Sequence, residues 1–65
     1  MIGVIIKELR SEHGLSQKEL GKILSVSQDT ISLWERGKSK PDVDTIITIA
    51  KYFNVSSDYI FGIAQ

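Results

Sequence analysis

One face of the segment from Ser27 to Arg36 collects side chains able to exchange hydrogen bonds with a partner. At about 100° per residue, the spacing of an α-helix, Ser27, Ile31 and Trp34 fall on one side, which we expect to face a core. The opposite side carries Asp29, Ser32, Leu33 and Arg36, with Gln28 at its flank. This outer face combines hydrogen-bond donors, acceptors and one apolar group.

Such a mixture matches the chemistry of base edges in a DNA major groove. Gln28 suits the edge of adenine, Asp29 the amino group of cytosine, and Leu33 the methyl group of thymine. We predict base reading by Gln28, Asp29, Ser32 and Leu33. Arg36 suits either guanine or a phosphate, and we group it with the phosphate contacts. The alternative is an ordinary solvated helix surface, and Asp29 fits equally well as an acid favouring the helix dipole.

Phosphate contacts are predicted around this segment. A helix beginning at Ser16 would present free backbone N–H groups to a phosphate, and Gln17 would add an amide donor. Three further phosphate contacts are predicted: Ser27, which starts the next helix, and Lys38 and Lys40 in the basic loop after that helix. The alternatives are that Ser16 only caps its helix and that the lysines are merely solvated. Between residues 16 and 40 the chain carries an excess of two positive charges.

Five helices are needed to position these groups. Apolar spacing and capping residues predict helices over residues 2–12, 16–24, 27–36, 42–53 and 56–61, separated by turns at residues 13–14, 25–26, 37–41 and 54–55. In the fourth helix, the predicted core face consists of Val43, Ile46, Ile47, Ala50 and Phe53. Because no strand is predicted, we expect a compact all-α fold with a helix-turn-helix over about residues 16–36.

Length and composition indicate one globular domain over residues 1–65. Val, Ile, Leu and Phe account for 21 of the 65 residues, enough for one core. There is no cysteine for a disulfide or thiolate zinc site, and no long apolar run for a membrane span, so we expect a cytoplasmic protein. Eight basic residues balance eight acidic ones, so overall charge does not indicate nucleic-acid binding.

Two other classes of function fit the sequence less well. We expect no enzyme, because His13 is the only histidine and no nucleophile stands with a base; neither a metal, a cofactor nor a small-molecule ligand is indicated. A protein-interaction module is the better alternative, since the charge is balanced and residues 59–63 form an apolar tail. A single helix reads only a short half-site, so we expect a homodimer through Phe61 and Ile63.

The chain resembles the lambda-repressor and Cro-like helix-turn-helix family of the xenobiotic-response-element type. The resemblance rests on residues 15–20 (LSQKEL), Val26-Ser27, residues 31–38 (ISLWERGK) and Pro41, and it extends over nearly the whole chain. It implies a five-helix domain that binds double-stranded operator DNA, commonly as a dimer, and regulates transcription in bacteria or phage, usually as a repressor. An antitoxin that regulates its own gene is possible within the same class.

The resemblance also assigns individual residues. It implies a phosphate contact at Gln17, base-reading positions at Gln28, Asp29 and Leu33, and a backbone-binding loop around Lys38 and Lys40. It further implies an ion pair between two residues that spacing alone would not join, namely Arg10 and Glu35.

The chain departs from the family pattern at two positions. Gly21 stands where alanine is common, which still allows close approach of the helices. Ser25 stands where the family has a turn glycine. Because a positive φ is uncommon outside glycine, we expect a slightly reshaped turn at Ser25.

Overall fold

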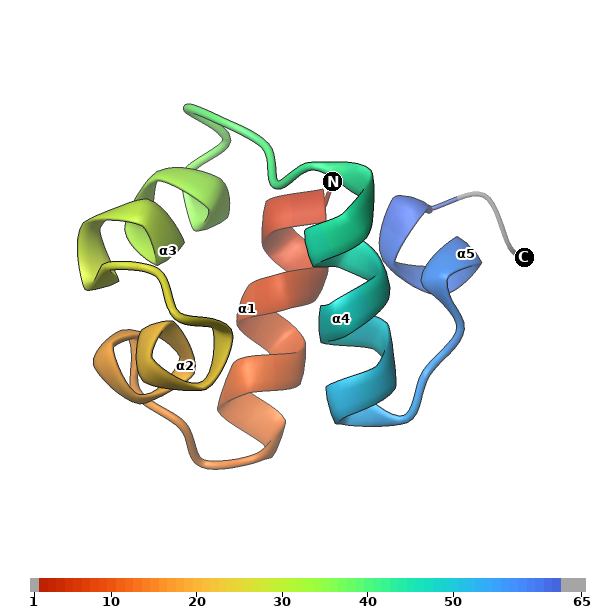
Figure 1. Cartoon of the computed structure of the whole chain (residues 1–65), viewed down its shortest axis with the longest axis horizontal. Helices are drawn as coiled ribbons and strands as arrows, with labels where there is room; N and C mark the ends of the chain where they lie inside the picture. Colours follow the sequence, from red (N-terminus) through yellow and green to blue (C-terminus); the bar gives the residue numbers. More distant parts are fainter. Residues whose placement is uncertain (1, 63–65) are drawn as a thin grey trace.

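The computed structural model describes residues 2–62, which form five α-helices and no strand (Figure 1). The helices are α1 (Ile2–Glu12), α2 (Gln17–Leu24), α3 (Gln28–Glu35), α4 (Val43–Phe53) and α5 (Ser57–Phe61). The predicted all-α, five-helix fold is confirmed. Within the described residues, no helix is long and apolar enough to cross a membrane.

The helix starts follow from capping side chains. Ser16, Ser27, Asp42 and Ser56 each precede a helix in extended backbone and accept a hydrogen bond from the backbone N–H three residues later. At α4, for example, Asp42 Oδ1 accepts from the Thr45 N–H at 2.8 Å. Each cap satisfies an N–H group that the helix itself leaves without a partner, which explains why the sequence predicts these starts so closely.

The turn between α2 and α3 has the left-handed backbone that glycine favours, although a serine stands there. Ser25 lies in the left-handed region, with φ 60° and ψ 39°, and its N–H donates to carbonyl groups at the end of α2. The reshaped turn that we expected is therefore not present, and that expectation was wrong. The turn conformation holds because α2 and α3 pack directly on each other, which outweighs the cost of a side chain at positive φ.

The core lies among the five helices, each of which contributes at least one buried side chain. Its fully buried large side chains are Ile6, Leu20, Ile31, Ile46, Ile49 and Ile60. Val55 packs against this cluster from the turn before α5. Figure 1 shows α2 and α3 on one side of α1, and α4 with α5 on the other.

The predicted core face of α4 was partly wrong. Ile46, Ala50 and Phe53 are buried as expected, but Val43 is 59% and Ile47 39% exposed. Ile49 is fully buried in their place. Both sets of residues have helical spacing, so the sequence pattern does not distinguish them; the packing of α4 against α5 and α2 decides which set is covered.

Two glycines allow helices to approach each other closely. A Cβ at Gly3 would collide with the carbonyl oxygen of Trp34, where α1 passes the end of α3. A Cβ at Gly21 would come within 2.7 Å of the Val26 carbonyl oxygen, between α2 and the start of α3. Both glycines are buried, and the absence of a side chain at each determines how closely α3 approaches α1 and α2.

Candidate nucleic-acid interface

The outer face of α3 lies open to solvent. Ile31 and Trp34 are buried on its inner side, with exposed fractions of 0% and 6%. Gln28 and Asp29 are exposed in the first turn, and Leu33 is 38% exposed. The structure thus brings the predicted base-reading side chains onto one accessible surface, with Ser32 half-buried among them.

Arg36, immediately after α3, is folded back along this face. Its Nε donates a hydrogen bond to Ser32 Oγ at 3.2 Å, one helical turn earlier. Its backbone N–H also donates to the Ser32 carbonyl at 3.0 Å, which keeps Arg36 in helical geometry. The sequence offers only the i, i+4 spacing as a sign of this side-chain contact.

The hydroxyl of Ser27, predicted to contact phosphate, caps α3. Ser27 Oγ accepts from the Thr30 N–H at 3.1 Å and lies 2.9 Å from Thr30 Oγ1. Thr30 was not predicted to take part in this cap. The pair holds the first turn of α3, where Gln28 and Asp29 are displayed.

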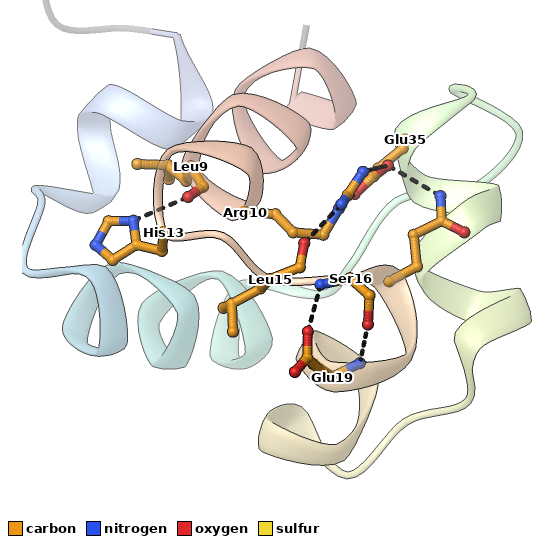
Figure 2. Close-up of polar contacts among 8 residues, drawn as sticks. Leu9, Arg10, His13, Leu15, Ser16, Glu19 and Glu35 are labelled. Atoms are coloured by element: carbon orange, nitrogen blue, oxygen red, sulfur yellow. Dashed lines mark hydrogen bonds and ion pairs between the residues drawn. The ribbon is translucent and has the colours of Figure 1, made fainter.

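Ser16 forms a complete capping box at the start of α2. Its Oγ accepts from the Glu19 N–H at 3.0 Å, and its own N–H donates to Glu19 Oε1 at 2.8 Å (Figure 2). The Ser16 N–H, together with the Ser16 side chain, lowers the pKa of the Glu19 carboxyl. Since the cap engages both the N–H and the oxygen of Ser16, its hydroxyl hydrogen is the donor left for a phosphate.

Gln17 takes part in a contact that the sequence did not predict. Its Nε2 donates to Glu35 Oε1 at 3.0 Å, joining the first residue of α2 to the last residue of α3. The two residues are 18 positions apart, so neither periodicity nor a local motif could have indicated the bond. One N–H of the amide is committed to Glu35, and the other remains for the phosphate contact predicted at Gln17.

Arg10 and Glu35 form the ion pair that the family resemblance implies. Arg10 Nε lies 2.7 Å from Glu35 Oε2, and Nη2 donates to Oε1 at 3.0 Å, a bidentate geometry. Arg10 Nη1 donates to the Leu15 carbonyl at 2.8 Å, in the turn before α2 (Figure 2). The side chains are only 14% and 3% exposed. This one cluster therefore ties α1, α2 and α3 together.

Each member of this pair favours the charged form of the other. Burial alone would raise the pKa of Glu35, but hydrogen bonds from Arg10 and Gln17, with the positive charges of Arg10 and Lys7, outweigh it and lower that pKa. The hydrogen bond to Glu35 raises the pKa of Arg10. Both side chains are therefore charged at neutral pH.

The loop after α3 presents Lys38 and Lys40 to solvent. Gly37, at φ 75°, ends the helix, and the Lys38 N–H donates back to the Leu33 carbonyl at 2.9 Å. Pro41 is buried and holds the far end of the loop. Within residues 2–62 neither lysine forms an ion pair, so both ammonium groups are available to an anionic partner.

Other candidate groups lie outside this surface. His13 Nδ1 lies 2.9 Å from the Leu9 carbonyl oxygen. The His13 ring packs edge to face against the Phe53 ring, with their centroids 4.7 Å apart. No group of three metal-ligating side chains forms in the part of the chain that the structure describes. Phe61, predicted at a dimer interface, packs partly against the core, and Ile63 lies outside the described residues.

Two named relatives match almost the entire chain in sequence. The transcriptional regulator ImmR of Bacillus subtilis is 36% identical over 61 residues, spanning 94% of this chain and 48% of ImmR. The antitoxin PezA of Streptococcus pneumoniae is 40% identical over 62 residues, spanning 95% of this chain and 39% of PezA. The chain therefore spans about half the length, or less, of these relatives.

A solved structure of a chain of similar length shows the same fold. The crystal structure of the phage P22 c2 repressor, in complex with a synthetic operator, superposes with a TM-score of 0.88 at 30% identity. The match covers 98% of this chain and 97% of the repressor chain. A family model described as helix-turn-helix matches residues 6–60. The chain belongs to the lambda-repressor and Cro-like helix-turn-helix family.

Proposed function

We propose that this chain is a single sequence-specific DNA-binding domain of a transcriptional regulator, most simply a repressor, with α3 in the major groove. The observation that carries the proposal is the outer face of α3, where Gln28, Asp29 and Leu33 are exposed opposite a buried Ile31 and Trp34. A helix held by its inner face and varied in chemistry on its outer face suits readout of base edges.

The surroundings of α3 support the same function. The start of α2 offers the amide of Gln17 and the hydroxyl of Ser16, and the loop after α3 offers Lys38 and Lys40 as phosphate contacts. The P22 repressor, whose fold this chain shares, was crystallised in complex with a synthetic operator. A cytoplasmic location follows from a function on chromosomal or phage DNA.

Selection from a random pool of DNA duplexes tests the proposal. The chain is expected to enrich a defined sequence, and fluorescence anisotropy should then show tighter binding to that duplex than to a scrambled one. Equal affinity for all duplexes, or no binding at low salt, would contradict sequence-specific DNA binding.

Two exposed apolar residues provide a matched pair of variants. Leu33→Ala removes an exposed side chain from the proposed reading face, and Val43→Ala removes one from α4. We expect Leu33→Ala to weaken binding to the selected duplex by about 5-fold, the lower end of the range for a bidentate base contact, because an apolar contact with a thymine methyl is the weaker interaction. Val43→Ala should leave the affinity unchanged. Equal effects of both variants would argue against α3 as the reading helix.

A homodimer is the proposed binding form, with the C-terminal segment, including Phe61 and Ile63, at the contact. Two copies would read two half-sites about one DNA turn apart, which makes the selected sequence palindromic. Phe61 is only partly covered by the core, which leaves part of its ring for a second copy. A chain that sediments as a monomer both free and on DNA would contradict this assembly.

A second candidate function is that of an antitoxin that regulates its own gene. The observation favouring it is the 40% identity to PezA across 95% of this chain. This function uses the same DNA-reading face, so it differs from the first only in requiring a protein partner. A stable complex with the product of an adjacent gene, recovered on co-expression, would distinguish the two.

A further inference from the structure

The Ser32–Arg36 hydrogen bond has a consequence for the sequence that α3 would read. Arg36 carries five N–H groups, and the one on Nε is occupied by Ser32 Oγ at 3.2 Å. No other hydrogen bond or ion pair of this guanidinium forms within residues 2–62. The Nη1 and Nη2 groups therefore remain as a planar pair of donors at the end of a side chain whose direction is set.

The direction in which Arg36 is held favours the bases over the DNA backbone. Gln28 begins α3, and Arg36 lies eight residues later, about 12 Å along the helix axis. A side chain extended away from α3 at this end would reach outward to a phosphate. Bonded to Ser32, it runs back about one turn, roughly 6 Å, toward the middle of the outer face.

We propose that Arg36 is a base-reading residue that recognises guanine, and that Ser32 is its positioning residue. Guanine presents two acceptors, O6 and N7, on its major-groove edge, which match two parallel N–H donors of a guanidinium. The proposal rests on the proposed DNA-binding function and adds a specific base to it. It replaces the phosphate contact expected for Arg36 from the sequence.

The charges around Arg36 are consistent with this role. Glu35, its neighbour in the chain, is occupied by Arg10 and Gln17 and turns its carboxylate away from the outer face. Arg36 is exposed, so its charge is not neutralised before DNA is bound. Ser32 offers a neutral acceptor, which orients the guanidinium without reducing its attraction to the acceptors of a base.

Selection from a random duplex pool, followed by anisotropy titration, tests the proposal. The wild-type chain should select a guanine in each half-site, and replacing that G·C pair by A·T should weaken its binding by about 5- to 150-fold. Arg36→Ala should bind the two duplexes equally. Replacing the selected guanine by 7-deazaguanine, which lacks the N7 acceptor, should weaken binding of the wild type and not of Arg36→Ala.

The positioning role of Ser32 has its own signature. Ser32→Ala should reduce the preference for guanine, while Ser32→Ala combined with Arg36→Ala should show no further loss beyond Arg36→Ala alone. A further loss in the double variant would mean that Ser32 contacts a base itself, and would overturn the positioning role. Lys51→Ala, which removes an exposed cation from α4, is the matched charge control and should keep the guanine preference.

The outcomes separate this inference from the function on which it rests. If wild type and Arg36→Ala select the same sequence and differ only in salt dependence, Arg36 contacts a phosphate and the inference is wrong, while DNA binding stands. If the wild type selects a defined sequence without a guanine, the inference is again wrong by itself. If the wild type shows no sequence preference, the proposed function fails and the inference with it. Circular dichroism of each variant checks that it is folded.

Discussion

At the scale of single residues, the Arg10–Glu35 ion pair is the polar contact that we expect to matter most for stability. Its side chains are 14% and 3% exposed, and Glu35 accepts from both Arg10 and Gln17. Removing Arg10 would leave a buried carboxylate with one neutral donor. Because an uncompensated buried charge is costly, we expect Arg10→Ala to lower the free energy of unfolding by about 3–5 kcal/mol.

Denaturant unfolding followed by circular dichroism measures this loss. Lys7→Ala is the matched control, because Lys7 is exposed on the same helix and acts on Glu35 only through its charge. Its effect should stay below about 1 kcal/mol, as for other exposed charges. An Arg10→Ala protein as stable as the wild type would show that the pair contributes nothing to the fold.

The lowered pKa of Glu35 predicts how stability changes with pH. A carboxyl whose pKa is lower in the folded state stabilises the fold above its ordinary pKa of 4.5, and this contribution is lost as the pH falls through the folded value. We therefore expect the free energy of unfolding to fall as the pH drops below about 4.5. Glu35→Gln should show a weaker dependence, with Glu19 and Asp42, whose pKa values are also lowered, supplying the remainder. An unchanged pH profile in Glu35→Gln would refute this assignment.

At the scale of helices, Gly3 and Gly21 allow α1 and α2 to pack closely against the two ends of α3. Alanine normally stabilises a helix by up to about 1 kcal/mol relative to glycine. Here a Cβ would meet the Trp34 carbonyl or come within 2.7 Å of the Val26 carbonyl, so either substitution must push α3 away. We expect Gly3→Ala and Gly21→Ala each to destabilise the fold by about 1–3 kcal/mol, as overpacking does.

Thermal unfolding provides the measurement for these two variants. Ser11→Ala, at an exposed position of α1, is a control for adding alanine to a helix and should shift stability by no more than about 0.5 kcal/mol. Stabilisation by Gly21→Ala would mean that α2 and α3 can separate without loss, and that a closer match to the family pattern is tolerated.

The helices also show what a sequence can and cannot predict. Their starts were predictable because a cap such as Ser16 or Asp42 acts over three residues. The buried face of α4 was only partly predictable, because Ile47 and Ile49 both continue a helical pattern and contacts with other helices decide between them. The Gln17–Glu35 bond was not predictable, since it depends on how α2 and α3 meet in space.

At the scale of the whole molecule, balanced charge distinguishes this chain from a general nucleic-acid binder. Eight basic residues offset eight acidic ones, so no broad positive field draws DNA to the surface. Affinity in the proposed complex must therefore come from a few placed groups around α3. The same condition favours the proposed dimer, because two copies would double the number of contacts available for specific binding.

The salt dependence of binding measures how many phosphates the chain neutralises. If Lys38 and Lys40 are the cations that neutralise phosphates, log K should fall with log salt at a slope of about −1.8 per bound copy, because each neutralised phosphate contributes about −0.9. Lys38→Ala should reduce the slope by about 0.9 and weaken binding to selected and scrambled duplexes alike. Lys51→Ala should leave the slope unchanged. A steeper wild-type slope that Lys51→Ala also reduces would mean that DNA meets a much wider surface than α3 and its loop, and a slope near zero would exclude phosphate contacts by these lysines.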